Sequence, residues 1–276
     1  MMIRWSWATA VVFASVALGG CSVTVESSEP PPSTPGDSGT LRFQYGDAGC
    51  GIFLNACPLD QPFLTGSEGD VAIVDGPSSG HVTFTFEGSV ASVTGQREYA
   101  HCVDAKSTTR DVDLDMPCAP GETKEAFRHV TLLGNAPGEG KVVVRDAKTG
   151  KEIDRVTVRV ASASDMRIEV SKRGPAEKDY SGVVPDGDVY RVRVSDKVRV
   201  RAEPLDAAKK PIRVGRHGVA HEYADRAVLA PSTDLGEAIL GSSDAESIVA
   251  KQSGETSLVV KAAGATRALQ FRVVRP

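Results

Sequence analysis

The chain has 276 residues, of which 41% are hydrophobic and 25% are charged, and its formal net charge is −4 at pH 7. This composition is ordinary for a globular protein and excludes a largely disordered chain. The slightly acidic balance gives no general attraction for nucleic acid, so we expect no nucleic-acid partner. The length allows one to three domains.

The first 20 residues have the pattern of an export signal. Arg4 precedes an apolar run, residues 5–18, that is shorter than the ~20 residues needed to span a bilayer. The run ends in Leu18-Gly19-Gly20-Cys21, which resembles the lipobox of bacterial lipoproteins. The resemblance implies that residues 1–20 are removed and that Cys21 carries acyl chains such as palmitate, which anchor the protein in the membrane. The alternative is an ordinary signal peptide that contains a cysteine.

A tether is expected to follow the lipidated cysteine. Residues 22–40 are rich in Ser, Pro, Thr, Gly and acidic residues, and such a segment cannot bury enough apolar surface to fold. We therefore predict that residues 21–40 comprise the lipidated cysteine and a disordered tether. Ser22 is not an acidic retention signal of the enteric type, which favours the outer membrane, on its periplasmic or surface face.

Beyond residue 40 the apolar residues repeat with a period of two, which is typical of half-buried strands in antiparallel sheets. The clearest runs are Val156–Val160, Tyr190–Val194, Val198–Ala202 and Leu269–Val273. Turn signals such as Pro185-Asp186-Gly187 separate them. Many short strands between frequent turns predict an all-β protein built from β-sandwiches.

An internal repeat predicts two domains. Gly138–Ala147 aligns with Gly254–Ala263, and the strand that follows each segment aligns as well. Each segment is expected to form the last hairpin of a domain, and the two segments are separated in the sequence by about the length of one sandwich domain. We predict domains over residues 41–161 and 162–276.

The hairpins resemble those of bacterial immunoglobulin-like domains of group 2, the type repeated in invasin- and intimin-like adhesins. Gly241-Ser242-Ser243-Asp244 before Ile248-Val249 is similar to a segment of that family, and Glu87–Val93 is similar to its counterpart in the first domain. Val198–Ala202 with the turn after it resembles the family's second strand. The resemblance implies two tandem immunoglobulin-like domains in a surface or periplasmic setting, with no catalytic residues and no cofactor.

Four cysteines remain after Cys21, and an even count in an exported protein predicts disulfides. They are Cys50, Cys57, Cys102 and Cys118. Three pairings are possible, and we favour the local pairs Cys50–Cys57 and Cys102–Cys118. We expect the loop inside the second pair to be exposed and to carry the recognition function of the first domain. The alternative is a metal site from His101, Cys102, Cys118 and His129, although the short Cys-x₂-Cys spacing of zinc sites is missing.

Three further motifs resemble catalytic or metal-binding patterns, and each also has a simpler structural explanation. Gly76–Gly80 fits G-x-S-x-G with His81 next to it, but we favour a hairpin because no helix is expected to follow. Asp111, Asp113, Asp115 and Glu122 have the spacing of a calcium loop, but the glycine for its sharp turn is missing, so an acidic edge strand is the alternative. His217 and His221, followed by Glu222, are expected to be surface histidines rather than metal ligands.

Basic residues alternate along two neighbouring predicted strands of the second domain. They are Arg191, Arg193, Lys197, Arg199 and Arg201. They could form one basic face for an anionic glycan or lipid headgroup, or they could be the solvated sides of two strands.

The sequence as a whole predicts a non-enzymatic, lipid-anchored envelope protein that serves adhesion, envelope structure or binding of a protein or glycan partner. We predict no metal site, and the oligomeric state stays open. The alternative is an exported hydrolase or metal-dependent enzyme with its site between Glu98 and His129.

Overall fold

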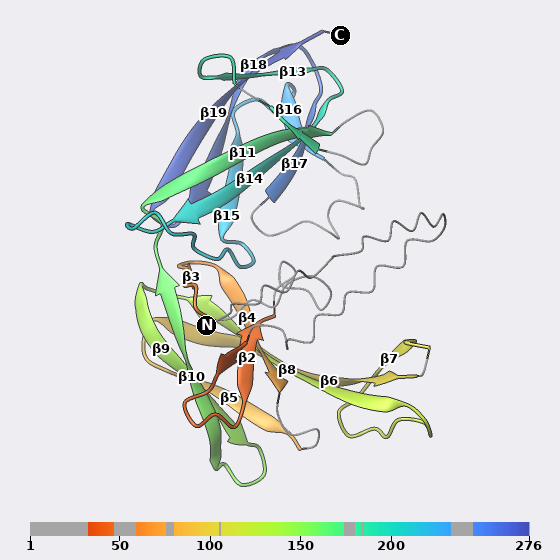
Figure 1. Cartoon of the computed structure of the whole chain (residues 1–276). Helices are drawn as coiled ribbons and strands as arrows, with labels where there is room; N and C mark the ends of the chain where they lie inside the picture. Colours follow the sequence, from red (N-terminus) through yellow and green to blue (C-terminus); the bar gives the residue numbers. More distant parts are fainter. Residues whose placement is uncertain are drawn as a thin grey trace, which may run out of the picture. The chain divides into compact units, whose positions relative to one another are not determined.

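The computed structural model describes residues 33–46, 59–75, 80–104, 106–173, 180–183, 185–232 and 245–275. The regular elements within these ranges are all β-strands (Figure 1). No helix in these ranges has the length and apolar character needed to cross a membrane. Cys21, the predicted lipidation site, and the cysteines Cys50 and Cys57, a predicted disulfide pair, lie outside the described residues.

The N-terminal half contains two antiparallel-rich sheets. The first has the order β1 (Thr34–Pro35), β2 (Arg42–Tyr45), β4 (Glu68–Asp75), β8 (Thr123–Gly134), β6 (Ala91–Val103) and β7 (Thr109–Val112). The second has the order β3 (Phe63–Leu64), β10 (Glu152–Ala161), β9 (Gly138–Asp146) and β5 (Val82–Glu87). Side chains of both sheets share one core that includes Phe43, Tyr45, Phe63 and Phe84.

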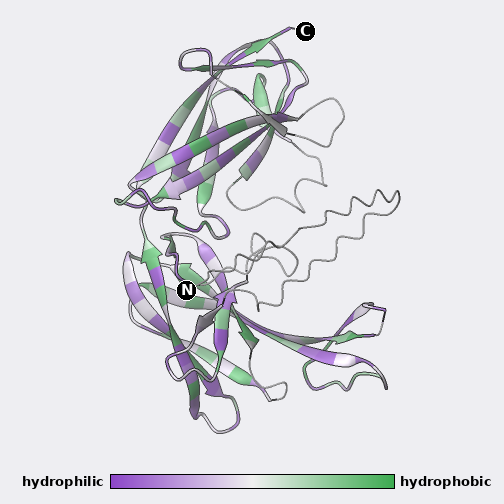
Figure 2. Ribbon diagram, in the orientation of Figure 1, coloured by the Kyte–Doolittle hydropathy of each residue, from purple (hydrophilic) through white to green (hydrophobic). Residues whose placement is uncertain are grey.

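The C-terminal half repeats this arrangement. Its first sheet has the order β12 (Tyr180–Gly182), β11 (Asp165–Arg173), β14 (Lys197–Leu205), β17 (Ala245–Ala250) and β16 (Leu229–Pro231). Its second has the order β13 (Val189–Arg193), β19 (Ala265–Val274), β18 (Gly254–Ala262) and β15 (Val219–Tyr223). Phe271, Leu229, Ile248 and Leu258 are fully buried in a separate core. Apolar and polar residues alternate along β11 and β14, as the period of two requires (Figure 2).

Both halves have the strand order of an immunoglobulin-like sandwich, in which strands A, B, E and D form one sheet and G, F and C the other. In the second half these are β11-β14-β17-β16 and β19-β18-β15, with β13 added parallel to β19. In the first half they are β2-β4-β8-β6 and β10-β9-β5, with β3 added parallel to β10. The predicted all-β, tandem immunoglobulin-like fold is confirmed, and the repeated hairpins are β9–β10 and β18–β19.

The predicted tether differs from the structure over its last eight residues, Ser33–Thr40. Thr34 and Pro35 pair with β2, and the turn after them is held by Asp154 on β10. The two carboxylate oxygens of Asp154 accept hydrogen bonds from the backbone N–H groups of Ser38 and Leu41, each at 2.9 Å. Polar composition misled the prediction, because this segment is held by hydrogen bonds to a buried carboxylate rather than by apolar burial.

Replacing Asp154 with Ala is expected to release Ser33–Thr40 and to lower the free energy of unfolding by about 2 kcal/mol, since two N–H groups lose a charged acceptor. Burial raises the pKa of the Asp154 carboxyl, but the backbone hydrogen bonds from Ser38, Leu41 and Arg155 outweigh it and hold the pKa below 3.8. Urea unfolding at pH 7 measures the loss, with exposed Glu139→Ala as the control. Equal stability of the Asp154→Ala variant and the control would contradict this role.

Candidate interaction surface

Over the residues that the structure describes, one hairpin of the first sandwich is much longer than its counterpart in the second. In the second sandwich the corresponding strand, β16, has three residues. In the first, β6 has 13 residues and β8 has 12, and their pairing continues from Ala91 opposite Gly134 to Val103 opposite Thr123. The short strand β7 pairs with the far end of β6 (Figure 1). We call the described part of residues 99–127 the arm.

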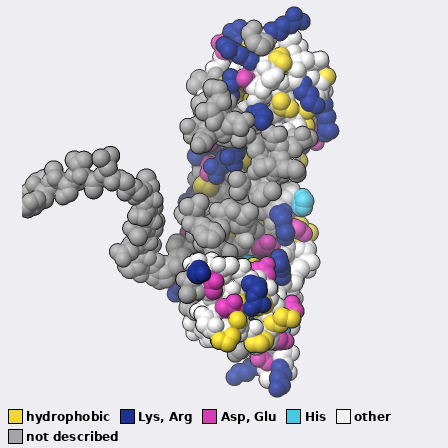
Figure 3. All heavy atoms as spheres, turned by 90° about the vertical axis from the view of Figure 1, so that its right-hand side faces the viewer, with side chains coloured by type: hydrophobic (Ala, Val, Ile, Leu, Met, Phe, Trp, Pro, Cys, Tyr) yellow, Lys and Arg dark blue, Asp and Glu magenta, His cyan; other side chains and the backbone are white. Residues whose placement is uncertain are grey.

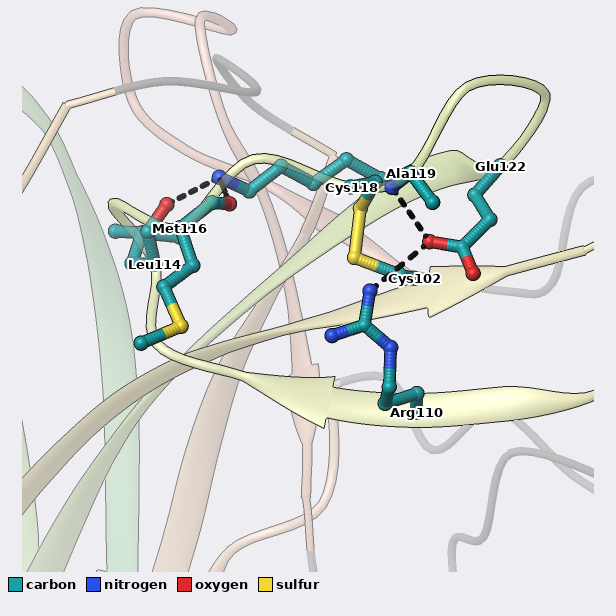
Figure 4. The surroundings of a disulfide bond; sticks show 8 residues. Cys102, Arg110, Leu114, Met116, Cys118, Ala119 and Glu122 are labelled. Carbon is teal, nitrogen blue, oxygen red and sulfur yellow. Dashed lines mark hydrogen bonds and ion pairs between the residues drawn. A yellow bond between two sulfur atoms is a disulfide. The ribbon is translucent and has the colours of Figure 1, made fainter.

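A small core and a disulfide hold the arm together. Ala100, Cys102, Val112 and Leu114 are buried against one another, with Cys118 and Ala126 packed beside them. Cys102 and Cys118 form a disulfide with a Cα–Cα distance of 5.5 Å (Figure 4). This is the pairing that the sequence favoured for these two cysteines. The disulfide closes a loop across 16 positions, in a segment with too few large apolar residues to be held by burial alone.

The loop inside the disulfide is fixed by further hydrogen bonds (Figure 4). The Lys124 ammonium donates to the carbonyl oxygen of Met116 at 2.8 Å and also to that of Leu114. The backbone N–H of Met116 donates to the carbonyl of Asp113 at 2.9 Å, which makes a tight turn. The loop backbone is therefore held at both sides of Met116.

This fixed loop presents an apolar side chain to solvent. Met116 is 51% exposed, and among the described residues the other large exposed hydrophobic side chain is Val74, at 40%. The neighbours of Met116 in the sequence include the exposed carboxylates of Asp113 and Asp115. Methionine is unbranched and polarizable, and it adapts well to an apolar partner surface. The loop can therefore bind an apolar pocket with a basic rim.

A histidine connects the loop to the rest of the sandwich. His81, directly before β5, places Nδ1 2.8 Å from Glu98 Oε2 and Nε2 2.9 Å from Asp115 Oδ2. Glu98 also accepts a hydrogen bond from the backbone N–H of Val82 and lies 3.5 Å from Nε of the buried Arg128. The hydrogen bond with Asp115, and next that with Glu98, raises the pKa of His81 above 6.5.

We expect the position of the loop to depend on pH through His81. Its folded-state pKa is raised, so the stabilisation is fully present below pH 6.5 and is lost as the pH rises through the higher folded value. Amide exchange protection of residues 113–118 should therefore fall across this range in the wild type and change much less in His81→Gln. His217→Asn is the control, since His217 is an exposed loop histidine. The same pH profile in the wild type and His81→Gln would show that His81 does not hold the loop.

The opposite face of the arm carries aromatic rings. Tyr99 stacks on Phe127 with ring centroids 5.2 Å apart, and on His129 at 5.8 Å, while the Arg97 guanidinium lies 4.6 Å from the Tyr99 centroid. His101 contacts Phe127 at 4.5 Å. Side chains alternate across a strand, so these rings point away from the disulfide face. They stabilise the paired strands β6 and β8.

The alternative metal site is not formed in the described part of the chain. The sulfur atoms of Cys102 and Cys118 are used in the disulfide, and His101 points to the other face, where its Nε2 lies 2.9 Å from Asp111. Burial lowers the pKa of His129, which stacks in the aromatic row. The two cysteine sulfurs and the two histidines of the alternative metal site therefore lie on different faces of the arm.

The calcium motif is likewise dispersed. Asp111 pairs with His101, Asp115 with His81, and Glu122 with Arg110 at 3.1 Å. Glu122 also accepts the backbone N–H of Ala119 at 2.8 Å. Within the described residues the four carboxylates of the motif do not converge on one point. Asp111, Asp115 and Glu122 each have a partner that competes with a cation.

The G-x-S-x-G motif and the histidines His217 and His221 form no catalytic or metal site in the described residues. Gly80 and His81 lead into strand β5 rather than into a helix, which excludes a nucleophile elbow here; residues 76–79 lie outside the described residues. His221 was expected at the surface, but it is on β15, where its side chain is 8% exposed and Nδ1 lies 3.8 Å from Glu246. Burial lowers the pKa of His221. His217 is exposed in the preceding loop, as predicted.

The interpretation of the basic residues as one face is wrong. Arg191 and Arg193 are on β13, whereas Lys197, Arg199 and Arg201 are on β14. These strands belong to different sheets of the sandwich, so their solvated sides face in different directions. The chain passes from one sheet to the other in the turn around residues 194–196. The alternation of polar and apolar residues could not indicate this change of sheet.

No family model and no curated protein matches the chain. Several solved structures resemble it at low sequence identity. Domains 5–6 of the S-layer protein SbsC are 15% identical, with 78% of this chain and 93% of that chain covered and a TM-score of 0.26. The Escherichia coli adhesin FdeC is 14% identical, with 88% and 66% covered and a TM-score of 0.27. The D0–D1 domains of intimin are 11% identical, with 77% and 95% covered and a TM-score of 0.24.

Proposed function

We propose that this chain is a non-enzymatic, lipid-anchored protein of the cell envelope that binds a partner protein through the loop closed by Cys102 and Cys118. One observation supports this most strongly: the loop is fixed by covalent and hydrogen bonds, yet it leaves Met116 exposed. A protein that needed this loop only for stability would gain by burying that side chain.

Because the loop is already fixed, it loses little conformational entropy when it binds a partner. Ordering a mobile loop costs about 0.5–1.5 kcal/mol for each immobilised side chain, and a loop already held by a disulfide avoids part of that cost. The carboxylates of Asp113 and Asp115 beside Met116 favour a partner with a basic rim, because complementary charge speeds association and excludes acidic surfaces. The partner we propose has an apolar pocket flanked by Lys or Arg.

The organisation of the chain belongs to the same proposal. Residues 1–20 are a lipoprotein signal peptide, Cys21 is the lipidated residue, and the following segment connects it to the first sandwich. The domains extend over residues 41–161 and 162–276, with residues 33–40 packed on the first. The anchor places the protein at the outer membrane, on its periplasmic or surface face.

Replacing Cys21 with Ser is expected to abolish incorporation of a labelled fatty acid, because the thiol is the proposed acceptor. Cys50→Ser is the matched control and should label like the wild type. Labelling is measured on the immunoprecipitated protein after growth with alkyne-palmitate. A labelled Cys21→Ser variant would contradict the proposed anchor.

The binding proposal is tested by cross-linking in intact cells, followed by purification of the full-length protein. The wild type should yield a cross-linked partner that is lost when Cys102 and Cys118 are both replaced with Ala. The variant Val74→Glu, which adds a charge near the end of β4, should still yield the cross-linked partner. An unchanged set of cross-linked products in the disulfide variant would refute binding through this loop.

A further inference from the structure

A cavity of about 650 Å³ lies in the second sandwich, where the chain passes from one sheet to the other between β13 and β14. It lies apart in sequence from the arm and has no part in the function proposed above. Its lining residues are Lys172, Arg191, Val192, Arg193, Asp196, Val274 and Arg275. Figure 3 shows Lys and Arg side chains at the end of the molecule that carries the C-terminus.

The turn at the base of this cavity is held in place. One carboxylate oxygen of Asp196 accepts hydrogen bonds from the backbone N–H of Arg193 at 2.7 Å and from the Lys172 ammonium at 2.8 Å. Ser195 has a φ of 74°, a left-handed conformation, and its N–H donates to the carbonyl of Ala250 at 2.7 Å. The backbone that positions the arginines is therefore rigid before any ligand binds.

The charges around the cavity are strongly unbalanced. Four of its lining residues are cationic and one is acidic, and Lys172 already neutralises Asp196. Among the described residues, no carboxylate pairs with the guanidinium groups of Arg191, Arg193 or Arg275. On the same sheet Arg272, by contrast, is paired with Glu255 at 2.7 Å. Arg191 and Arg193 are two positions apart on β13, so their side chains lie on the same face and repel one another, and a bound anion would relieve that repulsion.

We propose that this cavity binds a phosphate monoester. Guanidinium groups match phosphate oxygens with paired N–H donors, and a doubly charged phosphate suits the two neighbouring arginines of β13 better than a single carboxylate does. The volume is within the range of small-molecule sites and leaves room for a sugar-sized or glycerol-sized group on the phosphate. The phosphate could come from a phosphorylated sugar or from a lipid headgroup.

The test titrates the full-length protein with two probes by isothermal calorimetry. Glucose 6-phosphate represents the sugar source, and soluble dihexanoyl phosphatidic acid, used below its micelle concentration, represents the lipid source. We expect the preferred probe to bind with a dissociation constant of about 1 mM or tighter. The double variant Arg191→Gln/Arg193→Gln should bind it at least about tenfold more weakly.

A charge-matched control separates a site from a general effect of charge. Arg167→Gln/Arg272→Gln also removes two positive charges from this sandwich, but both arginines are paired with carboxylates outside the cavity. This control should keep the wild-type affinity. Equal weakening in both double variants, or no binding of either probe, would overturn the proposal. Circular dichroism of each variant verifies that the fold is retained.

Discussion

Removing the disulfide by Cys102→Ala/Cys118→Ala is expected to unfold the outer part of the arm while both sandwich cores stay folded. A disulfide that closes a loop of this length contributes about 3 kcal/mol. The remaining core of the arm consists of small side chains around Val112 and Leu114, which cannot replace that amount by burial. Amide exchange of β7 and of residues 113–118 should therefore become faster by about 100-fold.

The expected effect is local because the arm and the sandwich have separate cores. Protection of β9 and β10, and of all strands from β11 onward, should stay at the wild-type level. Cys50→Ala/Cys57→Ala is the matched control for the loss of two cysteines and should leave the arm protected. Unchanged exchange in β7 of the Cys102→Ala/Cys118→Ala variant would mean that strand pairing alone holds the arm.

Replacing Met116 with Glu is expected to have the largest effect on partner binding. A central apolar contact of an interface typically contributes 2 kcal/mol or more, so affinity for the cross-linked partner should fall by about 30-fold or more. The fold should not change, because the side chain is 51% exposed and its backbone is held by Asp113 and Lys124. Binding of the purified variant to the purified partner measures the effect.

Two controls accompany this substitution. Met116→Leu keeps an apolar side chain of similar volume and should retain most of the affinity. Val74→Glu introduces the same charge at the other large exposed hydrophobic residue of the described ranges and should bind like the wild type. If Val74→Glu weakens binding as much as Met116→Glu does, added negative charge rather than the loop contact is responsible.

The sandwiches could be predicted from the sequence because strand alternation is a local signal. Leu269, Phe271 and Val273 are buried in the second core, and their alternation with Gln270 and Arg272 predicts that directly. The repeat in β9–β10 and β18–β19 identified the closing hairpins for the same reason. The pairing Cys102–Cys118 followed from the proximity of the two cysteines in the chain.

The candidate site was less predictable because it depends on contacts between distant segments. Asp115 appeared in the sequence as part of a calcium motif, but its partner His81 is 34 positions away. Met116 occupies the position where a calcium loop has its glycine, and nothing else in the sequence distinguished it. An apolar residue within an acidic run was the available signal in the sequence. The hydrogen bonds of Lys124 that help to fix the loop are visible only in the structure.

The division of the basic residues between two sheets was also not predictable from local sequence. Alternation indicates which side of a strand is solvated, but not which sheet the strand joins. The chain passes from β13 to β14 through a turn that the Asp196 carboxylate stabilises, and these contacts are not visible in the alternation. The register of β13 beside β19 completes the cavity, and that pairing joins residues about 80 positions apart.

The most direct test of binding through the loop is site-specific photo-cross-linking in living cells. The photoreactive amino acid p-benzoylphenylalanine is placed at position 116 in one strain and at position 74 in another, and adducts of the full-length protein are compared after irradiation. A discrete protein adduct at position 116 that is absent at position 74, and that excess wild-type protein but not Met116→Glu removes by competition, is the result we predict. No adduct at position 116, or the same adducts at both positions, would contradict the proposed binding surface.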